Sequence, residues 1–280
     1  RIAVDQAPLL HLHVAEDPLQ QRWLVHALAH HIVIDHTSLE LIVEEAQLLE
    51  QGRVDELVPP VASRELFGQA LLGIGQDEHQ AFFQQMLSDV DEPTAPFGLL
   101  DVQGDGRNLQ RARSLLPRDV AGGLRQAARR HGVSAASLMH LAWALVVAQA
   151  SGREDVVFGT VLSGRLQGGD QARRVMGMFI NTLPLRIRLG GQGVRNALRQ
   201  THQALAQLVR HEHASLSLAQ RCSGVAAPAP LFSALFNYRH TPWQGGPASD
   251  QAFLEAVELM GVREHTNYPL CLDVDDLGEG

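Results

Sequence analysis

The sequence has 280 residues, of which 45% are hydrophobic, and a formal net charge of −8 at pH 7. This composition is typical of a globular chain that buries a large core in one large domain or two smaller ones. The arginines are scattered rather than gathered in a basic stripe, which argues against a nucleic-acid partner. Cys222 and Cys271 lie far apart without metal-ligand spacing, so we expect neither a disulfide framework nor a thiolate zinc site.

The chain carries no sequence typical of export or of a membrane span. Residues 1–10 contain Asp5 and Pro8 where a secretory signal would have a long apolar run. The most apolar helical stretch, residues 138–150, is shorter than the roughly 20 residues that cross a bilayer. With cysteine usage that fits a reducing compartment, these features predict a cytoplasmic protein with no membrane contact.

The first predicted elements are a β-hairpin and a helix. Residues 9–14 and 23–34 are rich in Leu, Val, Ile and Ala and are separated by a Glu-Asp-Pro turn. Thr37 and Glu40 have the spacing of a capping box, with Thr37 as the N-cap. We therefore expect a helix that begins there and stops near Gly52.

Two stretches rich in Pro, Gly and Asp, residues 58–63 and 91–107, flank a short predicted helix at 77–87 and form the candidate linker. Beyond it strands and helices alternate, which predicts an α/β fold without an internal repeat. Helices are expected at 117–130, ended by Gly132, at 134–150, capped by Ser134, and at 194–211. Strands are expected at 155–162, 178–189, 231–238 and 253–259.

Residues 30–38, with the sequence HHIVIDHTS, are the most informative segment because they place two histidines and an aspartate where the strand meets the helix. Such a junction can hold a base in a fixed pose. Taken alone, a His-His pair beside an apolar strand is more often core packing than catalysis. A metal site is disfavoured, because adjacent histidines do not easily aim at one ion and no cysteine or repeated carboxylate completes a ligand set.

This segment resembles the HHxxxDGxS signature of nonribosomal peptide synthetase condensation domains, which belong to the chloramphenicol acetyltransferase-like superfamily. Four further blocks occur in that family's order. They are residues 158–165 (FGTVLSGR), 176–186 (MGMFINTLPLR), 211–216 (HEHASL) and 230–238 (PLFSALFNY). The 176–186 block resembles the family's GMFVNTLPLR sequence almost residue for residue, and the ordered set is far more specific than any single block.

The resemblance implies an α/β, two-lobed chloramphenicol acetyltransferase-like fold, V-shaped, with a tunnel between the lobes. Members of the family usually have more chain before the histidine motif and after the last block, so we expect this chain to be incomplete at both ends. Residues 1–105 would be the end of the N-terminal lobe, with the histidine motif and the linker. Residues 106–280 would be the incomplete C-terminal lobe.

The reaction that the resemblance implies is amide-bond formation, in which a carrier-bound aminoacyl amine attacks a carrier-bound donor acyl or peptidyl thioester. The implied partners are donor and acceptor peptidyl carrier protein domains and a neighbouring adenylation domain of the same synthetase. The domain itself would bind no cofactor, because the substrates are carried on the 4'-phosphopantetheine arms of the carriers.

Family analogy gives His31 the catalytic role, as a base or as a hydrogen-bond acceptor for the acceptor amine. Asp35 and His30 would be structural supports, with Asp35 paired to Arg165 or Arg186, and His30 facing away because adjacent strand residues point to opposite sides. The tunnel-lining candidates are His36, Ser38, Ser163, Gly164, Arg165, Asn181, Thr182, Asn237 and Tyr238. Two alternatives to a tunnel-lining role carry equal weight. Asn181 and Thr182 would instead satisfy backbone groups of their strand, and Gly164 would instead allow a tight turn.

One departure from the family pattern keeps other functions open. His36 stands where the family usually has glycine, so either the loop tolerates a side chain there or the site is altered. The alternatives are a catalytically idle condensation-like platform that recruits a carrier protein or a tailoring enzyme, and an epimerization domain, whose sequences share features with residues 236–238. A free-standing acyltransferase that uses coenzyme A is disfavoured by the synthetase-type blocks.

Overall fold

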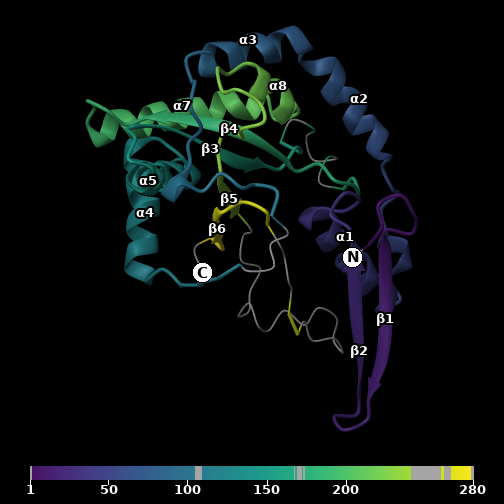
Figure 1. Ribbon diagram of the computed structural model, residues 1–280. Helices are drawn as coiled ribbons and strands as arrows, with labels where there is room; N and C mark the ends of the chain where they lie inside the picture. Colours follow the sequence, from purple (N-terminus) through teal and green to yellow (C-terminus); the bar gives the residue numbers. More distant parts are fainter. Residues whose placement is uncertain are drawn as a thin grey trace. The chain divides into compact units, whose positions relative to one another are not determined.

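The computed structural model describes residues 2–104, 109–166, 168, 172, 174–240, 260–261 and 266–278 (Figure 1). The chain forms two compact units. Among the described residues, unit 1 comprises those within 2–70 and 165–180, and unit 2 comprises those within 71–164, 181–240, 260–261 and 266–278. The predicted boundary at residue 105 does not coincide with this division, because residues 71–104 cluster with unit 2.

Unit 1 begins with the expected antiparallel hairpin, in which β1 (Leu10–Asp17) pairs with β2 (Arg22–Ala29) along its whole length. The prediction that the second strand reaches residue 34 is wrong. The backbone N–H of Val33 donates to the carbonyl of His30 at 3.1 Å, which closes a turn immediately after the strand. His30 and His31 therefore lie in a turn, and strand alternation does not set their directions.

Helix α1 (His36–Glu50) follows that turn, but its start differs from the prediction. The N-cap is Asp35, whose side chain accepts from the backbone N–H of Ser38, so the proposed Thr37 and Glu40 capping box is wrong. Both pairs have the same three-residue spacing, and the carboxylate of Asp35 is the group that the fold buries. The helix ends at the C-cap Gln51 next to Gly52, which has a φ of 71°.

The predicted linker is more structured than its composition suggests. A short 3-10 helix, η1 (Val54–Glu56), precedes helix α2 (Ser63–Gly73), which the sequence reasoning missed. In unit 2, α3 (Gln76–Leu87) confirms the predicted short helix, and η2 (Pro96–Gly98) lies in the second Pro-rich stretch. Thr94 there makes a β-bridge with Phe232, so this stretch is packed onto the sheet.

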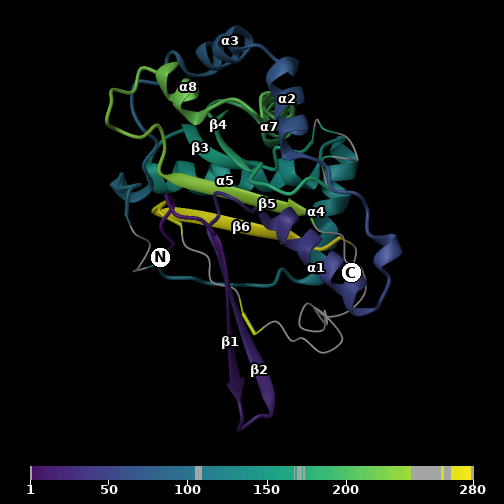
Figure 2. The same cartoon turned by 90° about the vertical axis from the view of Figure 1, so that its right-hand side faces the viewer.

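Unit 2 is built around a mixed four-stranded sheet in the order β4-β3-β5-β6. Its strands are β3 (Asp155–Leu162), β4 (Asn181–Arg188), β5 (Ala234–His240) and β6 (Leu270–Asp276). β3 pairs antiparallel with β4 and parallel with β5, and β5 pairs parallel with β6 (Figure 2). The sequence did not predict β6, and the strand predicted at 253–259 lies outside the described residues.

Three further helices of unit 2 match the predictions closely: α4 (Arg118–His131), α5 (Ala135–Ser151) and α7 (Val194–Arg210). The short helix α8 (Leu216–Arg221) was not predicted. Ser134 caps α5 as predicted, and Gly132 ends α4 in the left-handed conformation. Within the described residues no single helix is long and apolar enough to cross a membrane; α4 and α5 pass that test only as a pair bent by 107°.

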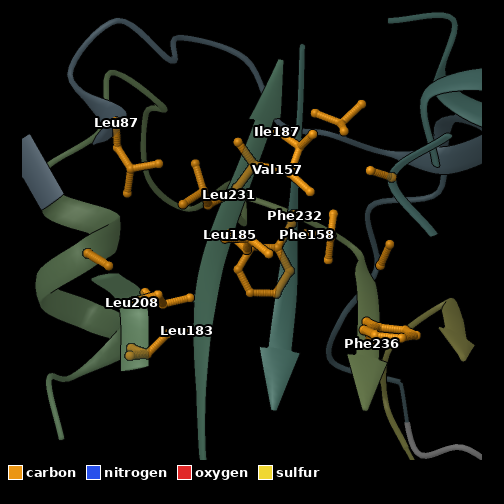
Figure 3. Packing of buried hydrophobic residues seen from close by; sticks show 14 of the residues in the cluster. Leu87, Val157, Phe158, Leu183, Leu185, Ile187, Leu208, Leu231, Phe232 and Phe236 are labelled. Carbon is orange, nitrogen blue, oxygen red and sulfur yellow. The ribbon is translucent and has the colours of Figure 1, made fainter. Parts of the chain in front are cut away.

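The core of unit 2 lies between the sheet and the helices that pack on it (Figure 3). Alternate residues of β4 and neighbouring residues of β3 supply fully buried side chains, including Leu183, Leu185 and Phe158. Helix α3 adds Phe83 and Leu87, both with no exposed area, which explains why residues before position 105 belong to this unit.

His140 of α5 is a polar residue inside this core, 3% exposed. Its Nδ1 lies 2.7 Å from the carbonyl oxygen of Ala136, which can only accept, so Nδ1 carries the proton. Nε2 then accepts from the hydroxyl of Thr160 at 2.8 Å. Burial lowers the pKa of His140 from its ordinary value of 6.5 to about 4, against the smaller opposing effect of the Ala136 hydrogen bond.

This buried imidazole predicts acid sensitivity of unit 2. The unfolded chain takes up a proton at His140 as the pH falls below 6.5, whereas the folded chain does so only near pH 4. The folded state therefore has its full stability above pH 6.5 and loses stability as the pH falls from 6.5 to about 4. The free energy of unfolding should drop by roughly 2 kcal/mol between pH 7 and pH 5 through this residue. His140→Gln should remove that loss in guanidinium unfolding, whereas the exposed His131→Gln should keep it. An unchanged pH dependence in His140→Gln would contradict the assignment.

Candidate functional site

Five residues of unit 1 form a buried polar cluster behind the histidine motif, which we call the Asp35 cluster: Asp35, Ser38, Arg165, Gly177 and Phe179. Asp35 is 3% exposed, Ser38 is 0% exposed and Arg165 is 5% exposed. The cluster joins the start of α1 to the segment Arg165–Ile180, which is distant in sequence but belongs to the same unit.

Asp35 uses both of its carboxylate oxygens in this cluster. Oδ1 accepts from the backbone N–H of Ser38 at 2.8 Å and lies 2.7 Å from the Ser38 hydroxyl. Oδ2 accepts from the backbone N–H of Phe179 at 3.2 Å. The same carboxylate therefore caps α1 and fastens the 165–180 segment to it.

Arg165 is the partner of Asp35, and Arg186 is not. The Nη2 of Arg165 lies 2.9 and 2.8 Å from Oδ1 and Oδ2 of Asp35, and the Nε of Arg165 lies 3.2 Å from Oδ2. Nη1 donates at 2.6 Å to the carbonyls of Ala172 and Val175, and the guanidinium carbon lies 4.4 Å from the ring centre of Phe179. The charge is thus paired, hydrogen-bonded and stacked, which is what a buried guanidinium requires.

Ser38 completes the cluster from the first turn of α1. Its hydroxyl oxygen accepts from the backbone N–H of Gly177 at 3.0 Å and lies 2.9 Å from the carbonyl oxygen of the same residue. Gly177 has a φ of 152°, which favours glycine. Ser38 is therefore a buried structural contact, and it does not reach solvent as the prediction of a tunnel-lining role would require.

The electrostatics of Asp35 favour its charged form. Burial alone would raise the pKa of the carboxyl, but the hydrogen bonds from Ser38 and Arg165, together with the charge of Arg165, outweigh burial and lower it below 3.8. Asp35 therefore stays ionised and paired, which suits a support and does not suit a proton donor or acceptor for a substrate.

The two histidines of the motif differ in their surroundings. The Nδ1 of His30 accepts from the backbone N–H of Ile32 at 3.1 Å, so this half-buried ring is part of the turn. His31 is exposed. The turn and the Asp35 cluster therefore fix the backbone on both sides of His31 while its ring stays accessible to a reactant.

His36, which replaces the family's glycine, fits this geometry without strain. It is the first residue of α1, its side chain is 55% exposed and its Nε2 lies 3.2 Å from Glu40 Oε1. In the part of the chain that the structure describes, the residues other than glycine with positive φ are Gln21 and Phe97. Position 36 therefore does not need glycine for its backbone conformation.

For the amide formation that the family resemblance implies, we expect His36→Gly to change the rate little. Helix α1 should lose up to about 1 kcal/mol of stability, because glycine is a poor helix former. Product formation by the variant and the wild type, measured side by side on loaded carriers, checks this expectation. A large gain in rate would show that His36 obstructs the site.

Arg186 belongs to a separate ion-pair group in unit 2. Its guanidinium binds Asp89 at 2.5 Å and Asp155 at 2.6 Å, and its Nη1 donates to the carbonyl of Met86 at 2.8 Å. Arg186, Asp89 and Asp155 line a cavity of about 460 Å³ together with Asp91. None of the predicted site residues lies along that cavity.

The other predicted tunnel residues lie in unit 2. Gly164 follows β3 with a φ of 67°, and its N–H donates to Glu212 Oε2 at 3.1 Å. Ser163 precedes it, and Thr182 follows Asn181 in β4. The side-chain amide of Asn181 donates to two backbone carbonyls, which is the structural one of the two roles considered for it.

Asn237 and Tyr238 of β5 contact the neighbouring strand. Asn237 Nδ2 donates to Asp273 at 2.9 Å, and the Tyr238 hydroxyl donates to Asp276 at 2.5 Å. Burial, and then the hydrogen bond to Asp276, raise the pKa of Tyr238. Burial alone would raise the pKa of Asp276, but the hydrogen bonds from Tyr238 and Arg125 outweigh burial and lower it to about 2. Both β5 residues thus hold β6 in place.

The sequence reasoning missed the contributions of Gly177, Phe179 and Glu212. All three lie in blocks that the resemblance singled out, but a block does not reveal which of its residues meets a distant partner. Among the described residues, no group of three or more His, Cys, Asp or Glu side chains has the arrangement of a metal site.

Comparison with known proteins identifies the family. The family model described as "Condensation domain" matches residues 1–280. The chain belongs to the condensation domain family. This confirms the family predicted from the five sequence blocks.

Relatives of this condensation domain include two synthetases of Mortierella alpina. Malpinin synthetase is 47% identical over 278 residues, which are 99% of this chain and 4% of that protein. Malpibaldin synthetase is 45% identical over 289 aligned positions, which cover 100% of this chain and 5% of that protein. The chain thus spans about a twentieth of the length of these relatives.

Solved structures support the predicted α/β fold. The condensation domain from Monacolin K polyketide synthase MokA has a TM-score of 0.70 at 21% identity, with coverage of 96% of this chain and 64% of that one. The first condensation domain of the CDA synthetase has a TM-score of 0.64 at 22% identity, with coverage of 85% and 54%. At this level of identity the likeness concerns the fold alone.

Proposed function

We propose that this condensation domain forms an amide bond between two substrates that carrier domains deliver. The nitrogen of an acceptor aminoacyl group attacks the donor thioester carbonyl, a C–N bond forms, the C–S bond breaks, and the donor carrier regains its thiol. The amine nitrogen loses a proton in the process. The observation that carries the proposal is the accessible His31 on a backbone that the Asp35 cluster fixes.

Catalysis of this reaction requires mainly that the two substrates be held in the correct position. A thioester is already activated, so bringing two tethered groups together supplies most of the acceleration, with effective molarities of about 10⁵ to 10⁸ M for well-oriented groups. General base catalysis typically adds about 10² to 10⁴-fold. His31 would contribute the second effect by accepting a proton or a hydrogen bond from the amine.

The substrates would arrive on 4'-phosphopantetheine arms of donor and acceptor carrier domains, and an adenylation domain would load the acceptor. This part of the proposal rests on the family and on the synthetase relatives. The idle platform is less favoured because His36 is accommodated without strain and the Asp35 cluster is intact.

The test is intact-mass detection of condensed product on the acceptor carrier, in the complete synthetase module with both carriers loaded. We expect the acceptor carrier to gain the mass of the donor acyl group, and no gain when either carrier is unloaded. Carrier binding without product would indicate a platform. Mass gain from free acyl coenzyme A without a donor carrier would indicate a free-standing acyltransferase.

A further inference from the structure

Between β3 and β4 the chain leaves unit 2 and returns to it. Leu162 and Asn181 are paired at the ends of these antiparallel strands, and the intervening segment Arg165–Ile180 belongs to unit 1. That segment carries Arg165, which holds Asp35. The chain leaves unit 2 at Gly164, immediately before Arg165, and re-enters it at Asn181, two residues after Phe179 of the Asp35 cluster.

One turn of unit 2, residues 211–214, binds both of these points. The Glu212 carboxylate accepts from the backbone N–H of Gly164, the last residue before the segment, at 3.1 Å. The side-chain amide of Asn181, the first residue after it, donates to the carbonyls of Glu212 and Ala214 at 2.8 and 2.6 Å. We call these three hydrogen bonds the 212–181 clamp.

The residue types of the clamp are difficult to explain by packing alone. Glu212 is 0% exposed, and a buried carboxylate costs free energy that an apolar side chain of similar size would not. An apolar side chain would leave the N–H of Gly164 without this acceptor. Asn181 uses both hydrogens of its amide, which neither aspartate nor threonine could supply.

The turn that carries the clamp is itself firmly placed. His211 is 6% exposed, its ring stacks on Phe82 at 4.0 Å between centres, and its Nδ1 lies 2.9 Å from Nδ1 of His79 in α3. On the other side, Ser215 caps α8 by accepting from the N–H of Leu218. Helices α3, α7 and α8 thus anchor the clamp to the core of unit 2.

We propose that Glu212 and Asn181 are positioning residues for condensation, because they fix both ends of the segment that carries Arg165 and thereby the support of the histidine motif. This inference rests on the proposed function for its catalytic consequence. Neither residue needs to touch a substrate. Asn181 was predicted to line the tunnel, and this role replaces that prediction.

The test compares Glu212→Ala, Glu212→Gln and Asn181→Asp in the complete synthetase module. Glu212→Ala should lower kcat by about 10²-fold with little change in KM for the acceptor carrier, the size of loss expected when a reacting group is misplaced by about 1 Å. Glu212→Gln should restore most of the rate, because its amide oxygen can accept from Gly164. Asn181→Asp should behave like Glu212→Ala, because it has no donor for the two carbonyls.

Amide hydrogen exchange gives a second readout that does not depend on activity. In Glu212→Ala we expect faster exchange in residues 163–166, and in Glu212→Gln exchange like that of the wild type. Ser134→Ala, which removes the N-cap of α5 in the same unit, is the matched control and should change neither kcat nor exchange at 163–166.

The inference is overturned if Glu212→Ala shows wild-type exchange at 163–166, if Glu212→Gln is as slow as Glu212→Ala, or if Ser134→Ala reduces kcat as much. If the wild-type module forms no amide product, the proposed function fails, and the exchange measurement alone decides whether the clamp holds the segment.

Discussion

Asp35→Ala should destabilise unit 1 by about 3 to 5 kcal/mol, because it leaves the guanidinium of Arg165 buried without its counter-charge. The same change removes the cap of α1 and the acceptor for the N–H of Phe179. Hydrogen exchange in the full synthetase measures the effect locally. Protection should fall in residues 36–50 and 174–180, while the core strands of unit 2 keep theirs.

The burial of the pair, rather than its charge alone, sets the size of this effect. Arg188 and Asp89 also form an ion pair, but their side chains are each 60% exposed, and surface pairs contribute about 0 to 1 kcal/mol. Arg188→Ala is therefore the matched control and should leave protection unchanged. Wild-type protection in Asp35→Ala would contradict the structural role of the cluster.

A double variant separates the pair from its surroundings. Asp35→Ala together with Arg165→Ala removes both charges, so it should cost less than the sum of the two single variants. The stabilisation from Asp35 should also disappear in acid. Because its pKa is lowered in the folded state, its contribution is complete above the ordinary value of 3.8 and is lost as the pH falls through the lower, folded value.

Local signals in the sequence were enough to predict most elements of unit 2. Ser134 caps a helix through an atom three residues away, and Gly132 adopts a left-handed conformation that a side chain would disfavour. These contacts lie within a few residues, so the pattern contains them. Strand β6 was missed because its sequence, LCLDVDD, is acidic, and its pairing with β5 decides its structure.

The details of the candidate site depended on contacts that a sequence does not display. The spacing of Thr37 and Glu40 predicted the cap of α1, but the carboxylate of Asp35, which is buried against Arg165, caps the helix instead. Arg165 and Arg186 were equally good partners in sequence. In unit 2 Arg186 forms ion pairs with Asp89 and Asp155, and no pattern along the chain reveals these pairs.

His31→Ala should lower the rate of amide formation by about 10² to 10⁴-fold, the usual contribution of a general base. The expected reason is that His31 is accessible while its neighbour His30 is held in the turn by the N–H of Ile32. Alanine removes both ring nitrogens without disturbing the Asp35 cluster. Intact-mass detection on the acceptor carrier over time gives the rate.

His26→Ala is the matched control, because His26 is an exposed histidine of β2 in the same unit. Its product formation should equal that of the wild type. His31→Gln distinguishes the two roles left open for His31, since glutamine can accept a hydrogen bond from the amine but is a negligible base. A rate near that of the wild type in His31→Gln would mean that the ring orients the amine, whereas a rate as low as that of His31→Ala would mean that it takes the proton. An undiminished rate in His31→Ala would leave positioning as the whole source of catalysis.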